Sequence, residues 1–410
     1  MAINVEFYAK LRNKAKLESE IKDLSKKYGC HAMKTPKGYA LSFCNMGMVT
    51  VNVTENKLSG SAQTNTAGAG FHAALVDFLC DLGDNTGMDM KIGDPTNYHL
   101  HKNFRRLKEE HMYAWLKSVL RMPLERPVPP TQYCMGYNIS GFIPENIGGT
   151  IVTSMGRFSI ASLKKRLAEK GLDDLANDFF VWNNYEKDAR YSRNNAVYLL
   201  NMICCFKPSS RSEYDKNVNG AIINHLEAAL KKDRTIPFPK AEYLEICELD
   251  GHEPLDTSDV PEMEHDYPFG YKKNDVCYRV GDLNFMLPGS FLSAPDRESG
   301  CMIYTNGDKD DRVTVRVKAV KGKEKPELDS EIFKDCTGPA VDFDCGAGRC
   351  RMGFMKSSDE KGKEFFTTVA LVVCGYQASI VSISYADGER RKWAESTVRR
   401  MNALENNSEK

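Results

Sequence analysis

The segment 59–72, Ser-Gly-Ser-Ala-Gln-Thr-Asn-Thr-Ala-Gly-Ala-Gly-Phe-His, has the composition of a loop that could hold an anion. It joins a predicted strand to the first turn of an amphipathic helix, where backbone N–H groups and the helix dipole favour negative charge. The candidate ligand-binding residues are Thr64, Asn65, Thr66, Gly68, Gly70 and His72. The Gly-Lys-Ser/Thr ending of a Walker A loop is missing, and so is G-x-G-x-x-G. The alternative is a capped helix start, in which hydroxyl and amide groups accept from free N–H groups and glycines permit close packing.

The histidines do not predict a metal site. His99, His101 and His111 lie close together in the sequence, but zinc needs three or four ligands that converge tetrahedrally. His111 is expected to face the core of a helix that runs from about residue 101 to 121. We therefore expect no metal, no other cofactor and no catalytic residue.

The cysteines are thirteen in number and contain no C-x-x-C pair. The N-terminus has no apolar signal segment, so reduced thiols and a cytoplasmic location are expected. Cys336, Cys345 and Cys350 form the densest group. The neighbouring Arg349 and Arg351 could lower the pKa of Cys350 and make it reactive; the alternative is that these cysteines are small apolar residues in a sheet.

The charge balance excludes some partners. The 410 residues contain 56 basic and 56 acidic side chains, whereas a nucleic-acid binder normally carries a basic excess. The apolar runs are shorter than the roughly 18–20 residues that cross a bilayer. We expect no nucleic-acid partner and no membrane insertion; a protein partner is favoured, and a small anionic ligand is possible.

Four regions are predicted, and together they indicate an α+β protein. Residues 1–124 read as an α+β domain with a helix, a three-stranded sheet and two helices, and residues 125–240 as a helical domain entered through four closely spaced prolines. Residues 241–271 contain ten acids and no Lys or Arg, which is typical of an acidic linker; a docking strip for a basic partner is the alternative. Residues 272–405 alternate Val, Ile and Thr with charges and predict an antiparallel sheet covered by helices, acting as a binding module.

The last region resembles a known family. The motif Phe-Met-Leu-Pro-Gly-Ser-Phe at 285–291 is followed by a turn from Gly300 to Tyr304, an alternating strand, a helix, two long strands and a closing helix. This order is similar to the PsbP/DcrB-like α/β/α sandwich, a family that includes effector-associated chaperones of type VI secretion. The resemblance implies a binding or chaperone module without a shared catalytic residue.

The sequence therefore favours a non-enzymatic, cytosolic binding or adaptor protein, or a chaperone-like one, of a bacterial multi-component system. The alternative function is an enzyme or sensor that binds a phosphorylated small ligand at the 64–72 loop. The two hypotheses differ in whether that loop lines a pocket with converging basic side chains.

Overall fold

The computed structural model describes residues 2–126, 128, 131–136, 141–308, 311–328, 330–358 and 364–405. The chain forms two compact units, each assembled from several stretches. Unit 1 comprises Met1–Tyr137, Asn146–Ile203 and Asn217–Phe269, and unit 2 comprises Asn138–Glu145, Cys204–Lys216 and Gly270–Lys410. Both units combine helices with antiparallel strand pairs, which confirms the expected α+β class.

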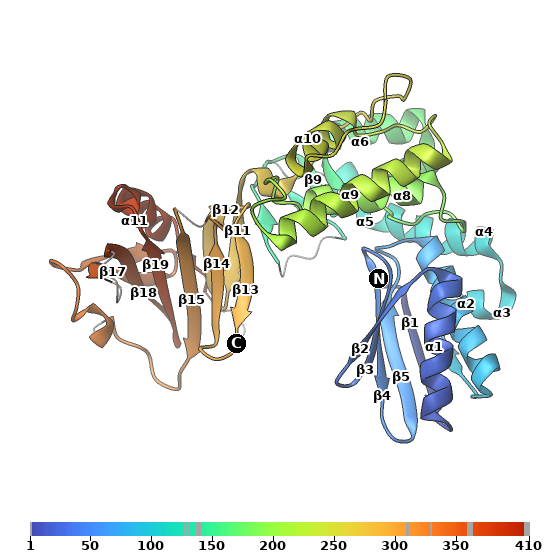
Figure 1. The fold of residues 1–410 in the computed structure, drawn as a ribbon, viewed down its shortest axis with the longest axis horizontal. Helices are drawn as coiled ribbons and strands as arrows, with labels where there is room; N and C mark the ends of the chain where they lie inside the picture. The colour runs from blue at the N-terminus through green and yellow to red at the C-terminus, as the bar shows by residue number, and fades with distance from the viewer. Residues whose placement is uncertain are drawn as a thin grey trace. The chain divides into compact units, whose positions relative to one another are not determined.

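Unit 1 begins with a six-stranded antiparallel sheet of order β2-β3-β4-β5-β1-β6. Its strands are β1 (Asn4–Lys10), β2 (His31–Thr35), β3 (Gly38–Cys44), β4 (Gly47–Val53), β5 (Lys57–Gln63) and β6 (Lys91–Gly93). The helices α1 (Lys14–Tyr28) and α2 (Ala69–Thr86) cover one face of the sheet (Figure 1). Sequence reasoning expected three strands; β1, β2 and β6 were missed, and the last of these has only three residues.

The single helix expected from 101 to 121 is divided. The structure contains α3 (Tyr98–His101), α4 (Phe104–Arg106), a π-helical turn Leu107–Met112 and α5 (Tyr113–Glu125). Lys102 adopts a left-handed conformation with φ 50°, and Asn103 caps α4 by accepting from the Arg106 N–H. A non-glycine residue in that conformation cannot continue a helix, so the chain restarts at Asn103. His111 lies half-buried in the π-helical turn.

The other described residues of unit 1 form a small sheet and five helices. The sheet has the order β10-β9-β7, with β7 (Tyr133–Cys134), β9 (Thr150–Thr153) and β10 (Gly156–Ser159). The helices are α6 (Ile160–Glu169), α7 (Gly171–Ala176), α8 (Ala189–Met202), α9 (Glu213–Lys232, in unit 1 from Asn217 on) and α10 (Lys240–Asp250). The middle region is therefore packed with the N-terminal sheet in one unit and is not a purely helical domain.

The acidic stretch 241–271 is not a linker in this structure, because most of it is packed into unit 1. Its first part is α10, and from there to Phe269 it belongs to unit 1. Its buried apolar side chains are Tyr243, Ile246, Cys247, Val260, Met263 and Phe269. The Met263 N–H donates to the Phe238 carbonyl, and Arg234 supplies a countercharge to Asp259 from outside the stretch. The prediction failed because it counted charges only within the stretch.

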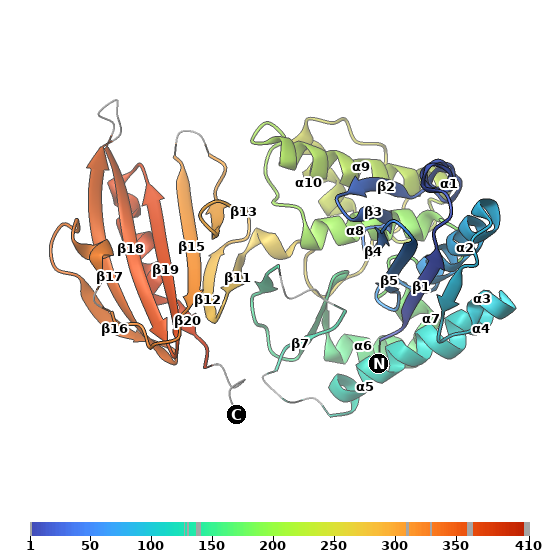
Figure 2. The ribbon, with the colours of Figure 1, turned by 90° about the horizontal axis from the view of Figure 1, so that it is seen from below.

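The described residues of unit 2 form two antiparallel sheets, where the sequence predicted a single antiparallel sheet for the last region. The smaller has the order β20-β12-β11-β8, from β8 (Ile143–Pro144), β11 (Asp275–Val280), β12 (Leu283–Pro288) and β20 (Asn402–Ala403). The larger has the order β13-β14-β15-β19-β18-β17-β16 (Figure 2). Its strands are β13 (Leu292–Asp296), β14 (Cys301–Thr305), β15 (Val313–Lys321), β16 (Val341–Cys345), β17 (Gly348–Ser358), β18 (Glu364–Cys374) and β19 (Gln377–Tyr385).

One face of the larger sheet is the core of unit 2. Val317, Val381 and Ala370 are fully buried neighbours on three adjacent strands. The helix α11 (Arg391–Arg399) contacts β18 and β12, and its Ala394 and Val398 are buried. Among the described residues, no helix is both long enough and apolar enough to cross a membrane.

Candidate functional site

The 64–72 loop is buried and bonded to the start of the chain. Thr64, Asn65 and His72 are each almost fully buried. The Asn65 Oδ1 accepts from the Ile3 N–H at 2.8 Å, and the Thr64 N–H donates to the Ile3 carbonyl at 2.9 Å. Thr66 is half-buried and lines a small enclosed cavity. These contacts hold the loop against the residues that precede β1.

The N-terminus of α2, for which the sequence allowed either an anion site or a capped helix start, is covered by the chain itself. The Gly70 N–H donates to the Trp182 carbonyl at 2.9 Å, and the Trp182 N–H donates to the Ala67 carbonyl at 2.9 Å. A Cβ at Gly68 would lie 2.5 Å from the Trp182 carbonyl oxygen, and one at Gly70 would lie 2.1 Å from the indole Cδ1. The two glycines therefore allow the Trp182 segment to approach. No side chain caps the helix at Gly68.

Thr64 and His72 belong to a buried polar network that extends to Asp94. The Thr64 Oγ1 lies 2.8 Å from the His72 Nδ1, and the Asp94 Oδ1 lies 3.2 Å from the His72 Nε2. Asp94 also accepts from the Thr96 N–H and hydroxyl at 2.8 and 2.7 Å, and from the His99 N–H at 3.0 Å. Burial acts to raise the pKa of Asp94, but these hydrogen bonds outweigh it and hold the pKa well below its usual range.

The order of groups in this network matches a hydroxyl–imidazole–carboxylate triad. All three side chains are buried, however, so a substrate has no access to the Thr64 hydroxyl. The arrangement instead joins α2 to β5 and to the turn at 94–99. Sequence reasoning missed Asp94, although the local Asp-Pro-Thr pattern is a common turn signal.

A second candidate site is a cleft of about 430 Å³ on unit 1, formed by α6, the α7 region, α8 and the segment 262–266. Its volume lies within the roughly 300–1,000 Å³ of ligand pockets. The basic side chains that line it are Lys165, Arg166, Lys170, Arg190 and Arg193. None of them was singled out from the sequence as a site residue.

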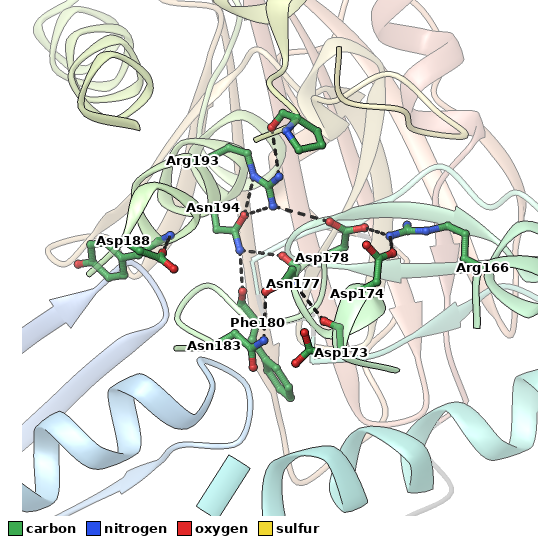
Figure 3. A network of polar contacts seen from close by, with 12 residues as sticks. Arg166, Asp173, Asp174, Asn177, Asp178, Phe180, Asn183, Asp188, Arg193 and Asn194 are labelled. Carbon is green, nitrogen blue, oxygen red and sulfur yellow. Dashed lines mark hydrogen bonds and ion pairs between the residues drawn. The ribbon is translucent and has the colours of Figure 1, made fainter. Parts of the chain in front are cut away.

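A network of polar contacts fixes one side of this cleft (Figure 3). The Arg166 Nη2 contacts Asp178 at 2.6 Å and Asp174 at 3.0 Å. The guanidinium of Arg193 is 4% exposed and donates to the Asn194 Oδ1 at 2.8 and 3.0 Å, while its Nη2 lies 3.9 Å from Asp178. Asp178 therefore lies between two arginines, and hydrogen bonds and ion pairs within the chain hold their side chains in place.

The two arginines have opposite pKa shifts because their surroundings differ. Burial lowers the pKa of Arg193, and the attraction of Asp178 only partly compensates. Burial also acts to lower the pKa of Arg166, but the nearby carboxylates of Asp178 and Asp174 outweigh it and raise the pKa. Asn194 completes the network by donating to the carbonyls of Asn177 and Phe180 at 2.8 and 2.9 Å (Figure 3).

Three cations at the cleft form no side-chain hydrogen bond and no ion pair in the part of the chain that the structure describes, although the charge of Arg190 acts on Asp173 and Asp233. Lys165, Lys170 and Arg190 line the cleft and make neither a hydrogen bond nor an ion pair there through their side chains. Charged side chains that face a cleft without a partner are available to a ligand. This availability distinguishes the cleft from the buried network around His72.

The hypothesis of a reactive thiol has a clear outcome. Cys350 is fully buried, and burial raises the pKa of its thiol to about 12. The interpretation of Cys350 as a reactive thiol activated by neighbouring arginines is therefore wrong. Within the described ranges, no group of three or more His, Cys, Asp or Glu side chains is placed to hold a metal ion.

Comparisons with known proteins add little to this description. No protein-family model matches the chain, and no curated protein matches it. A crystal structure from Bacteroides thetaiotaomicron VPI-5482 is similar over 30% of this chain, with 20% sequence identity and a TM-score of 0.25. The chain spans 46% of the length of that protein.

Proposed function

We propose that this chain is a non-enzymatic binding protein, an adaptor or chaperone-like component of a bacterial cytoplasmic system. In this proposal it holds a charged segment of a protein partner in the cleft of unit 1. The observation that carries the proposal is the set of three cations that form no side-chain hydrogen bond or ion pair, Lys165, Lys170 and Arg190, beside the network of Arg166, Arg193 and Asp178. An ordered surface reduces the entropy that is lost when a ligand binds.

The alternative of a phosphorylated small ligand at the 64–72 loop has less support. The N–H of Gly70 is already bonded to the Trp182 carbonyl, and the candidate side chains Thr64 and His72 are buried. A phosphate at that helix terminus would have to displace the Trp182 segment. The cleft requires no such rearrangement.

The test is capture of a partner by matched variants of the full-length chain. Reversing two of these cations, Lys165→Glu with Arg190→Glu, should raise the dissociation constant for the purified partner by about tenfold or more, because like charges then face each other in the cleft. The control reverses Lys22 and Lys117, two exposed lysines of unit 1 outside the cleft. Circular dichroism checks that both variants fold.

The result separates the two functions. Partner binding that is lost in the cleft variant and retained in the control supports the proposal. Equal binding by both variants would show that the partner does not bind at the cleft. Turnover of a bound small molecule by the native chain would show that the protein is an enzyme.

A further inference from the structure

The six-stranded sheet of unit 1 has one face that is covered by helices and one that is not. The strands β1 and β4 alternate between buried and exposed residues, and α1 and α2 lie on the buried side (Figure 1). This alternation is typical of a sheet with one face packed on a core and the other in contact with solvent. The open face consists of the side chains that the strands direct away from α1 and α2.

The register places long and short side chains next to each other on the open face. Ala40 on β3 is opposite Met33 on one side and Thr50 on the other. Met48 on β4 is opposite Ser42. Met33 and Met48 are 57% and 66% exposed, so both methionines project from a surface of short side chains. A methionine is flexible and fits readily into gaps of a second surface.

Charge is absent from the half of the open face that β2, β3 and β4 form. The only Lys, Arg, Asp or Glu on these three strands is Lys34, which donates to the Glu18 carboxylate of α1 at 3.0 Å and so lies on the other face. The charged residues of the open face are on β1, β5 and β6: Glu6, Lys10, Lys57 and Lys91. An uncharged centre beside a polar margin is typical of a protein interface.

We propose that the open face binds a second copy of this chain, with the two sheets stacked face to face about a two-fold axis. Such a contact joins a surface to itself, so the methionines of each copy lie over the short side chains of the other. Stacked sheets pack about 10 Å apart in this way. The formal net charge of the chain is zero, so there is no net repulsion between the copies at long range. The cleft of unit 1 takes no part in this contact.

The size of the open face sets the strength of the dimer. Six strands that are about 4.8 Å apart and about six residues long, at about 3.4 Å per residue, cover roughly 29 by 20 Å, or about 600 Å². Two copies would bury about 1,200 Å² in total, which is the lower limit of stable specific interfaces. We therefore expect a weak dimer with a dissociation constant of about 1–100 μM.

Sedimentation equilibrium of the full-length chain from about 1 to 200 μM tests this proposal. Met48→Glu should raise the dissociation constant of the dimer by about tenfold or more, because the contact is symmetric and each charge is introduced twice. The matched control is Met122→Glu, which alters a methionine of α5 that is 61% exposed and lies outside the sheet. Melting temperatures check that both variants fold.

Methionine oxidation by dilute hydrogen peroxide, measured by mass spectrometry, locates the contact on the unaltered chain. Met33 and Met48 should oxidise several-fold more slowly at about 200 μM than at about 1 μM protein, and Met122 should oxidise at the same rate at both.

Three results would overturn the proposal. The first is a chain that stays monomeric over the whole concentration range. The second is a dimer that both variants weaken equally, or that neither weakens, since the contact would then lie on another surface. The third is equal oxidation of Met33 and Met48 at the two concentrations. A dimer that Met48→Glu weakens and Met122→Glu does not, with both methionines of the open face protected, supports it.

Discussion

Replacing Asp94 with alanine should destabilise unit 1 strongly. The carboxylate accepts from the Thr96 N–H, the Thr96 hydroxyl and the His99 N–H, and faces the His72 Nε2 at 3.2 Å. Truncation leaves these buried donors without an acceptor, and breaking a buried pair in this way costs about 3–5 kcal/mol. Asp94→Asn keeps one acceptor oxygen and should cost about 1–3 kcal/mol.

The effect should depend on pH in a defined direction. Because the pKa of Asp94 is lowered on folding, the carboxylate contributes stability that is complete above its unfolded pKa of about 3.9 and is lost as the pH falls through its lower folded value. The free-energy difference between the parent and Asp94→Asn should therefore be complete above about pH 4 and shrink below it. A difference that grows on acidification would contradict the lowered pKa.

Urea unfolding followed by tryptophan emission can measure this in unit 1 alone. Trp115 and Trp182 lie in unit 1 and Trp393 in unit 2, so a Trp393→Phe background restricts the signal to unit 1. The control is Asp89→Ala, which removes an exposed carboxylate paired with Lys91 and should change stability by less than about 0.5 kcal/mol. An Asp94→Ala variant as stable as this control would refute the reasoning.

Three further predictions follow from buried contacts. Gly70→Ala should cost about 1–3 kcal/mol in the same unfolding assay, because its Cβ would overlap the Trp182 ring; an unchanged midpoint would show that the segment is free to move. Asn194→Ala removes the acceptor of the buried Arg193 guanidinium and the donor to the Asn177 carbonyl, and each group left without its partner should lower the free energy of unfolding by about 1–3 kcal/mol. The same variant should bind a ligand of the cleft more weakly. Normal binding together with normal stability would contradict the role of this network in the cleft. Cys350 should react with iodoacetamide only after unfolding in urea, since the thiol is buried with a pKa of about 12; rapid native labelling detected by mass spectrometry would reverse that assignment.

Local structure was predictable where it depends on neighbouring residues. The buried face of α1, with Leu17, Ile21 and Leu24, follows the spacing of apolar residues, and Gly29 ends the helix in a left-handed conformation. The end of α2 is less clear from the sequence, because the helix passes Gly83, continues to Thr86 and is capped by Gly87. Either glycine could supply the required positive φ, and sequence does not choose between them.

The two candidate sites were not predictable because their contacts span large sequence separations. Trp182 reaches Gly70 across 112 residues, and that single hydrogen bond changes the interpretation of the 64–72 loop from an exposed anion site to a covered helix terminus. Likewise, the charged residues of the cleft come from helices and from the segment 262–266, which the sequence predicted to be part of a linker. Charge counted along a sequence window omits countercharges that the fold brings from elsewhere.

The interleaving of the two units has a consequence for synthesis on the ribosome. Unit 1 is complete at Phe269, whereas unit 2 needs residues up to β20 together with two stretches already made, Asn138–Glu145 and Cys204–Lys216. The strand β8 emerges more than a hundred residues before β11, its only partner in the smaller sheet as described. Unit 1 can therefore fold co-translationally before β8 has a strand to pair with. A gene truncated near residue 270 would yield unit 1 together with the two stretches of unit 2 that lie within it, and these stretches would lack the rest of unit 2.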